Sequence, residues 1–168
     1  MDYRWIESPV GAILLTANQR SLTGLHLKDQ KYFPKLTENW SESSSSSILD
    51  LAEKQLAEYF AHQRQQFDLS LEPVGTDFQK QVWQLLREIP FGETISYGTL
   101  AQRVGQPTAS RAVGAANGRN PISIIVPCHR VIATSGKLTG YAGGLDRKQW
   151  LLRHEQTAIQ ECLNWELC

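Results

Sequence analysis

The sequence has few cysteines, no long apolar stretch and no excess of charge of either sign. Its 168 residues include three cysteines, and this odd number argues against a disulfide framework. A zinc site needs about four ligands in short paired spacings, which the sequence does not show, so we expect no metal and no cofactor. The longest apolar runs, GAILL and ISIIV, are far too short to cross a membrane. Because no export signal is visible, we expect a cytoplasmic monomer with no membrane partner.

The net charge of zero conceals an uneven distribution along the chain. Residues 1–75 carry 7 basic and 10 acidic side chains, whereas residues 76–155 carry 10 basic and 5 acidic ones. The second of these segments is therefore basic, which favours a polyanionic partner such as a nucleic acid.

The first part of the chain alternates strand-like runs with turn residues, and a helix follows them. Apolar residues at helical spacing predict an amphipathic helix over residues 48–62. The serine tract at 41–47 is typical of a mobile surface loop that acts as a linker. The expected strands are YRWIES at 3–8, AILLTA at 12–17, LTGLHL at 22–27 and QFDLSL at 66–71.

A boundary between two lobes is predicted near residue 76. Thr76 and Gln79 form a capping box, which begins a helix over residues 77–87. We therefore expect an N-terminal lobe over residues 1–75 and a second lobe over residues 76–168.

Two short helices are predicted in the second lobe. Ser96 can cap the helix YGTLAQRV, and Thr108 can cap the helix ASRAVGAAN after a short turn. Such a pair is the helix-turn-helix pattern, which indicates DNA binding only weakly when it stands alone. The fold class that follows is α+β, with a small sheet-and-helix lobe followed by a mostly helical lobe that contains a helix-turn-helix.

The segment NPISIIVPCHR places a cysteine between a proline and a histidine at the end of an apolar run. A cysteine in such a place is most often a buried, inert thiol. Here His129 supplies a titratable base and Arg130 a fixed positive charge, and both favour the thiolate of Cys128. Pro127 restricts how the chain enters this turn. The sequence therefore favours a nucleophilic cysteine over a structural one.

A proton relay is the simplest way to activate this thiol. Successive side chains point in different directions, so His129 needs a bridging water to reach Cys128. A base in this role also needs a third group to hold its ring. Glu155 is the best candidate, because it ends the last predicted helix, 146–155, which must fold back over the cysteine turn. Asn120 is placed to hold the turn through side-chain hydrogen bonds to the backbone.

Four pieces of the second lobe carry a resemblance to a known family. They are FGETISYGTLA, SRAVGAANGRNPISIIVPCHRVI, TGYAGG and KQWLLRHE. In order and spacing, residues 78–155 resemble the catalytic domain of the O6-alkylguanine-DNA alkyltransferases, which move an alkyl group from a damaged base to their own cysteine. The whole chain is most similar to the constitutive bacterial form. The resemblance implies a ribonuclease H-like first lobe, a winged-helix-like second lobe, and single-turnover repair of double-stranded DNA that bears O6-alkylguanine.

The resemblance also implies roles for the residues around the cysteine. Cys128 would be the alkyl acceptor, His129 would deprotonate it through a water, Glu155 would orient His129, and Asn120 would stabilise the turn. These roles agree with the chemical argument given above.

Further roles concern DNA and the damaged base. By resemblance, the second helix of the helix-turn-helix enters the minor groove and Arg111 replaces the extruded base in the stack. Small residues would let that helix approach closely. These small residues are Ala109, Ala112 and Gly114.

The resemblance assigns a pocket for the flipped base to six residues. Tyr97 would help to rotate the nucleotide and would donate a hydrogen bond to guanine, while the Val131 backbone would read the exocyclic amine. Tyr141 would form part of the pocket wall, and Gly143 and Gly144 would keep that wall open. Several relatives have a serine at the position of Ala142, so that contact would come from a backbone N–H here.

Two other interpretations of the same residues stay open at this point. A cysteine hydrolase could use Cys128, His129 and Glu155 as a triad, although the helix-turn-helix and Arg111 would then have no purpose. A DNA-binding module that marks lesions without repairing them would lack the acceptor cysteine, which is present here.

Overall fold

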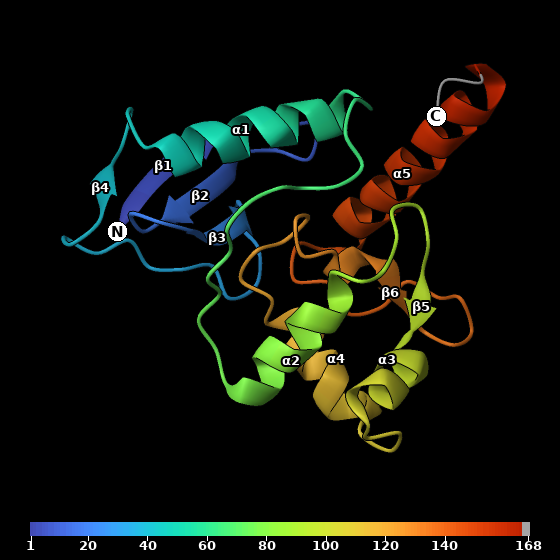
Figure 1. The fold of residues 1–168 in the computed structure, drawn as a ribbon. Coiled ribbons are helices and arrows are strands. Elements are labelled where there is room, and N and C mark those ends of the chain that lie inside the picture. Colours follow the sequence, from blue (N-terminus) through green and yellow to red (C-terminus); the bar gives the residue numbers. More distant parts are fainter. Residues whose placement is uncertain (166–168) are drawn as a thin grey trace.

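The computed structural model describes residues 1–165 of the chain (Figure 1). A small sheet with one helix across it forms the N-terminal part, three short helices follow, and a long helix ends the described chain. This arrangement confirms the predicted α+β class, a sheet-and-helix lobe followed by a mostly helical lobe.

The N-terminal sheet has the strand order β3-β2-β1-β4. The strand β2 pairs antiparallel with both β1 and β3, and β4 adds to β1 in parallel. Every residue of β2 is buried, because both faces of this strand are covered by other parts of the molecule. The first three predicted strands are confirmed. The strands span Asp2–Ile6 (β1), Ile13–Ala17 (β2), Leu22–Leu27 (β3) and Ser41–Glu42 (β4).

Helix α1, Ser47–Phe60, lies across the sheet (Figure 1). Its buried residues recur every three or four positions, which places them on the one face that packs on the sheet. The side chain of Ser46 caps the helix by accepting a hydrogen bond from the backbone N–H of Leu49. The serine tract is therefore not simply the mobile loop that we predicted, since Ser41 lies in β4 and Ser46 and Ser47 begin α1.

The predicted strand at 66–71 is wrong for most of its length. Only Leu71 forms a bridge, to Leu22. The side chain of Gln55 instead binds the backbone of Asp68 on both sides, donating to its carbonyl at 2.9 Å and accepting from its N–H at 2.8 Å. A side-chain amide of α1 thus takes the hydrogen bonds that a neighbouring strand would have made.

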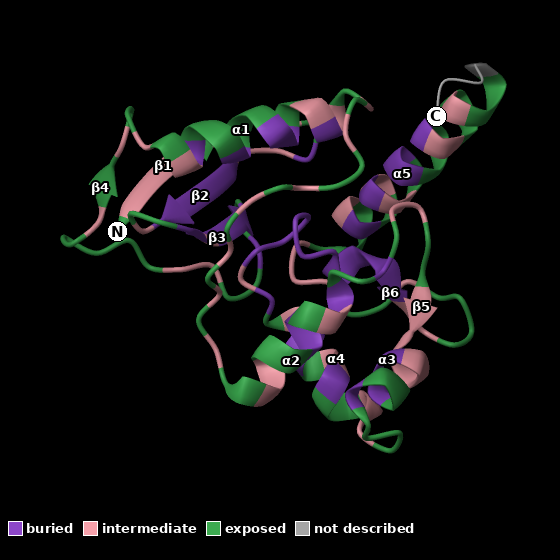
Figure 2. Ribbon diagram, viewed as in Figure 1, coloured by how far each residue is buried: buried purple, intermediate pink, exposed green. Residues whose placement is uncertain are grey.

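The segment before Cys128 is tied to the edge of the sheet. The N–H of Leu25 donates to the carbonyl of Pro121 at 2.9 Å, and the N–H of Ser123 donates back to the carbonyl of Leu25 at 3.2 Å. All residues from 122 to 131 are buried, and Figure 2 shows this buried segment continuing from the sheet into the centre of the molecule. The sheet therefore fixes the chain that leads to the cysteine.

The predicted helix starts are confirmed at two of three places. Thr76 and Gln79 form the predicted capping box of α2, Asp77–Leu86. Ser96 caps α3, Tyr97–Val104, which ends at Gly105 in the left-handed region. The prediction that Thr108 caps the next helix is wrong, because α4, Ser110–Gly118, begins after Ala109 without a side-chain cap.

The turn containing Cys128 leads into a short parallel strand pair. Cys128–Arg130 forms one turn of 3-10 helix, and the next two residues, Val131–Ile132 (β6), pair with Ile95–Ser96 (β5). Since β5 runs directly into α3, this pairing holds the helix-turn-helix beside the cysteine.

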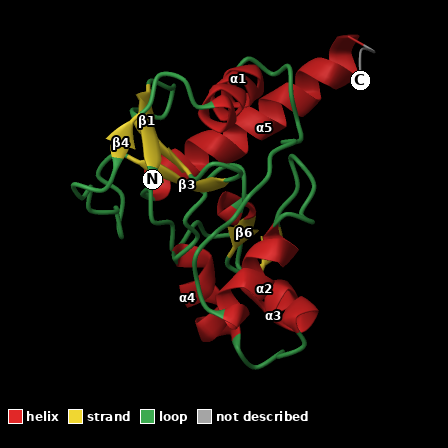
Figure 3. Ribbon diagram, turned by 60° about the vertical axis from the view of Figure 1, so that its left-hand side comes forward, coloured by secondary structure: helices red, strands yellow, loops and turns green. Residues whose placement is uncertain are grey.

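Helix α5, Leu145–Trp165, is longer than predicted. Glu155 therefore lies in the middle of the helix, not at its end. Figure 1 and Figure 3 show the C-terminal end of α1 approaching α5, where two side chains of α5 bind the hydroxyl and the backbone carbonyl of Tyr59. Among residues 1–165, no helix combines the length and apolar character needed to span a bilayer.

His26 in β3 makes the stability of the fold sensitive to acid. Burial lowers the pKa of His26 from 6.5 to about 4, so the unfolded chain binds a proton more readily than the folded chain does. The free energy of unfolding should therefore fall by about 3 kcal/mol as the pH drops from the unfolded to the folded pKa. We expect His26→Leu to lose less stability than the parent over this interval, as measured by urea unfolding at several pH values. Equal losses in the two proteins would contradict this role.

Candidate active site

Asn120 holds the turn that presents Cys128. Its amide donates to the carbonyl of Val126 at 2.7 Å, and its side-chain oxygen accepts from the N–H of Ile122 at 3.0 Å. Between these two points Ile124 has a φ of 71°, a left-handed conformation that a β-branched residue adopts only under strain. The side chain of Asn120 thus closes a strained loop immediately before the cysteine.

Cys128 is a buried free thiol, 4% exposed. Burial raises the pKa of the Cys128 thiol, while the side chain of Asn120 and the charge of Lys148 act in the opposite direction. The sequence pointed to Arg130 as the neighbouring positive charge, and that interpretation is wrong because its guanidinium binds Glu155. The thiol therefore rests in its protonated form and needs a base.

His129 has the geometry of that base. Its Nε2 lies 2.8 Å from Oε1 of Glu155, and since an ionised carboxylate only accepts hydrogen bonds, Nε2 carries the proton. The other nitrogen, Nδ1, is then an acceptor, and it is buried without a hydrogen-bond partner among the described residues. Burial lowers the pKa of His129, although the charge of Glu155 opposes this. The ring is therefore neutral and can take up a proton at Nδ1.

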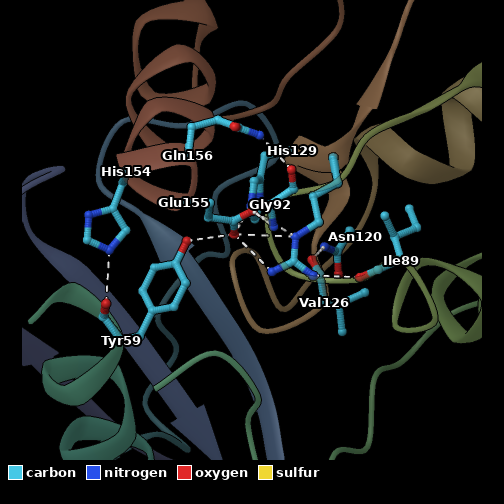
Figure 4. A network of polar contacts seen from close by, with 10 residues as sticks. Tyr59, Ile89, Gly92, Asn120, Val126, His129, His154, Glu155 and Gln156 are labelled. Carbon is cyan, nitrogen blue, oxygen red and sulfur yellow. Dashed lines mark hydrogen bonds and ion pairs between the residues drawn. The ribbon is translucent and has the colours of Figure 1, made fainter. Parts of the chain in front are cut away.

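Glu155 is the centre of a buried network (Figure 4). Arg130 donates from Nη2 to Oε1 at 2.9 Å and from Nε to Oε2 at 3.0 Å, and the N–H of Gly92 donates to Oε2 at 3.2 Å. Burial alone would raise the pKa of Glu155, but His129 and Arg130 outweigh it and hold the pKa well below its usual range. Glu155 is therefore an anion whose two oxygens are both fixed.

The backbone conformation of Gly92 lets its N–H come close to the Glu155 carboxylate. Gly92 has a φ of 78°, and a Cβ at this position would overlap the side chain of Ile159. Its carbonyl also accepts from the side chain of Gln156 at 2.6 Å. A larger residue at this position would push the loop away from α5 and from the Glu155 carboxylate.

The residues predicted for the base pocket come from three elements. The hydroxyl of Tyr97, on α3, donates to the carbonyl of Thr139 at 3.1 Å. The hydroxyl of Tyr141 is buried and has no partner among the described residues. Tyr141 and Ala142 line a groove that also contains Gly114 of α4. The structure thus brings the loop at 140–142 against the second helix of the helix-turn-helix.

The remaining predicted residues do not line this groove. Arg111 and Ala112 are exposed on α4, and Ala109 directly precedes that helix. A Cβ at Gly143 would lie 2.6 Å from the Leu27 side chain, so this glycine permits close packing on the sheet.

Lys148 is a site residue that the sequence reasoning missed. It is fully buried, and its Nζ donates to the carbonyl of Val131 at 2.6 Å and to the carbonyl of Thr139 at 2.8 Å. Burial lowers its pKa from 10.5 to about 8. Its spacing of two helical turns from Glu155 on α5 could have indicated it, because residues seven apart share a helix face.

Both parts of the chain match models of a known protein family. Residues 77–157 match the family model described as 6-O-methylguanine DNA methyltransferase, DNA binding domain, and residues 1–73 match the ribonuclease-like domain of the same family. The chain belongs to the 6-O-methylguanine DNA methyltransferase family.

Individual members of the family resemble the chain over nearly its whole length. A methylated-DNA–protein-cysteine methyltransferase from Mycolicibacterium paratuberculosis is 50% identical over 93% of this chain and 93% of its own. One from Methanosarcina acetivorans is 50% identical over 92% of this chain and 98% of its own. A crystal structure of Mycobacterium tuberculosis OGT in complex with DNA superposes with a TM-score of 0.88, at 48% identity, and covers 94% of each chain. The similarity to the 6-O-methylguanine DNA methyltransferases thus includes both lobes.

Proposed function

We propose that this protein repairs alkylated DNA by direct reversal, transferring the alkyl group of O6-alkylguanine to Cys128. The family is one of methyltransferases that act on DNA, and a similar protein has been crystallised with DNA. The observation that carries the proposal is the buried thiol of Cys128 beside His129, whose ring is held by Glu155 at 2.8 Å. In such an arrangement the base can remove the thiol proton and form the nucleophilic thiolate.

The transfer proceeds as an in-line displacement. The thiol proton of Cys128 passes through a water to Nδ1 of His129, the sulfur attacks the alkyl carbon, and the bond from that carbon to O6 breaks. The hydroxyl of Tyr97 turns from the Thr139 carbonyl and donates its proton to the departing guanine, and the phenolate then regains a proton that originates from the imidazolium of His129. The product is a thioether and an intact base. Because a thioether is not reversed by ordinary cellular chemistry, each chain acts once.

The pocket residues hold the guanine during this step. The Val131 carbonyl, which already accepts from Lys148, has a second lone pair for the exocyclic amine of guanine. The free hydroxyl of Tyr141 and the backbone at Ala142 and Gly143 complete the wall. Asn120 keeps the sulfur aligned by fixing the turn.

The test of this function is the mass of the intact chain. After incubation with excess duplex DNA containing O6-methylguanine, we expect the protein to gain the mass of one methyl group and the DNA to regain guanine. Continued release of product without a change in protein mass would support a hydrolase instead. An unchanged protein and unchanged DNA would indicate a lesion-binding module.

Extrusion of the base is required because the O6 carbon cannot be reached inside the stack. We propose that Arg111, exposed on α4, fills the vacated space, with the small residues Ala109, Ala112 and Gly114 allowing the helix to enter the minor groove. Unstacking costs a few kcal/mol, and it costs less for a base that already pairs poorly.

Arg111→Ala should slow repair of duplex DNA by on the order of ten-fold or more, since flipping is a few kcal/mol uphill, and should leave reaction with free O6-alkylguanine base unchanged. Single-turnover rates on the two substrates measure this. Arg103→Ala is the matched control, because it removes an exposed positive charge from α3 of the same motif. Equal losses for Arg111→Ala on both substrates would rule out the intercalating role.

A further inference from the structure

Tyr59 reaches the catalytic network from the other lobe. It lies near the end of α1 and is fully buried, with its ring against Phe60, Phe67 and Phe91. Its hydroxyl donates to Oε1 of Glu155 at 2.9 Å, across 96 positions of sequence. Figure 4 shows the Tyr59 ring pointing from α1 toward the carboxylate on α5. A residue of the sheet-and-helix lobe is thus bound directly to the relay.

The oxygen that Tyr59 binds is the one that holds His129. Oε1 of Glu155 accepts from Tyr59 at 2.9 Å and from His129 at 2.8 Å. Burial first, and then the charge of Glu155, raises the pKa of Tyr59 well above its ordinary value, so the phenol stays protonated and can only donate to the carboxylate. Hydrogen bonds to an ionised group are the strong ones, and this one acts together with the bond from Nη2 of Arg130 to fix where Oε1 points.

Tyr59 is itself fixed at a second point on α5. Nε2 of His154 lies 2.9 Å from the carbonyl oxygen of Tyr59, so it carries the proton and donates it. Consecutive residues of α5, His154 and Glu155, therefore bind the backbone and the side chain of the same tyrosine (Figure 4). This double attachment sets the position of the hydroxyl relative to α5, which packing of an aromatic ring alone does not require.

We propose that Tyr59 is a positioning residue for alkyl transfer, which orients the Glu155 carboxylate so that Oε1 holds the His129 ring with Nδ1 available to the thiol of Cys128. The inference rests on the proposed function and extends it, because it makes the N-terminal lobe part of the relay. Tyr59 touches neither the base nor the sulfur and acts only through Glu155.

Tyr59→Phe tests this role, since it removes the hydroxyl and keeps the ring. With free O6-alkylguanine base as substrate, we expect single-turnover transfer to Cys128 to be three- to ten-fold slower near pH 7. The loss should shrink at alkaline pH, where the thiol ionises without the relay. It should also vanish in a His129→Gln background, where no relay exists. A merely structural effect would persist in both situations.

Phe60→Leu is the matched control, because Phe60 packs on the Tyr59 ring at 5.3 Å between ring centroids and carries no hydroxyl. It should lower the melting temperature without a pH-dependent loss of rate. Parental rates for Tyr59→Phe near pH 7, or an equal loss at alkaline pH and in the His129→Gln background, would overturn the proposal. Failure of the parent chain itself to alkylate Cys128 would instead overturn the proposed function.

Discussion

Cys128→Ser is expected to abolish alkyl transfer and to leave binding to methylated DNA nearly unchanged. A serine hydroxyl remains almost wholly protonated where a thiol can ionise, and an alkoxide is a far poorer nucleophile toward an alkyl carbon. The replacement is close in size, so the buried turn held by Asn120 should keep its form. Rates of methyl transfer from labelled DNA, together with DNA affinity measured in the same buffer, give the two results.

The parent chain is the positive control for this variant. Peptide mapping after reaction with excess methylated DNA should find the added methyl on Cys128 and no second methyl elsewhere. Methyl transfer by Cys128→Ser at a measurable rate, or a methyl on a different residue of the parent, would contradict the proposed nucleophile. Loss of DNA binding together with transfer would mean that the variant had disrupted the fold.

The sequence predicted which polar residues meet around the cysteine better than it predicted how they bind. His129 and Glu155 do pair, as the need for a third group suggested, and Asn120 does hold the turn. Arg130 follows the cysteine directly, yet its side chain turns away to Glu155 and to the carbonyl of Ile89 at 2.7 Å. Adjacency in sequence cannot reveal this, because the direction of a side chain depends on which partners the folded chain brings near.

The long-range contacts of the site were the hardest to predict from the sequence. Nothing in the local pattern around Tyr59 separates it from the other apolar residues of α1, and its partner lies 96 positions away. The first part of α5 was predicted and its continuation was not, although Ala158, Ile159, Cys162 and Leu163 repeat at helical spacing beyond Glu155. The capped helices α2 and α3 were predicted well, since their signals are local and were confirmed as capping hydrogen bonds.

In the resting site the nucleophile is a neutral thiol next to a balanced ion pair. The buried cation Arg130 and the buried anion Glu155 neutralise one another, while burial raises the pKa of the Cys128 thiol. A neutral thiol is oxidised less readily than a thiolate. In the proposed mechanism the thiolate therefore forms only through the relay of His129.

Glu155→Gln should slow transfer on the order of a hundred-fold near neutral pH, the low end of the contribution of a positioned general base. The amide removes the negative charge that opposes the lowering of the His129 pKa by burial, so the imidazole becomes a weaker base. The parent and variant rates should converge as the pH rises through the pKa of Cys128, because hydroxide then forms the thiolate without help. Profiles of the transfer rate against pH, with free O6-alkylguanine base as substrate, measure this convergence.

The same change also leaves the buried guanidinium of Arg130 without its anion, and breaking such a pair destabilises a protein by about 3–5 kcal/mol. Arg130→Gln is the matched control, since it breaks the same ion pair and leaves the bond between Glu155 and His129. Both variants should lose stability, and rates should be measured well below either melting temperature. Glu155→Gln should show by far the larger rate loss, and this loss should disappear at alkaline pH, because Arg130→Gln keeps the carboxylate that binds His129. Parallel profiles for Glu155→Gln and the parent at every pH would make Glu155 a structural residue and leave the activation of Cys128 to Lys148, whose charge lowers the pKa of the thiol.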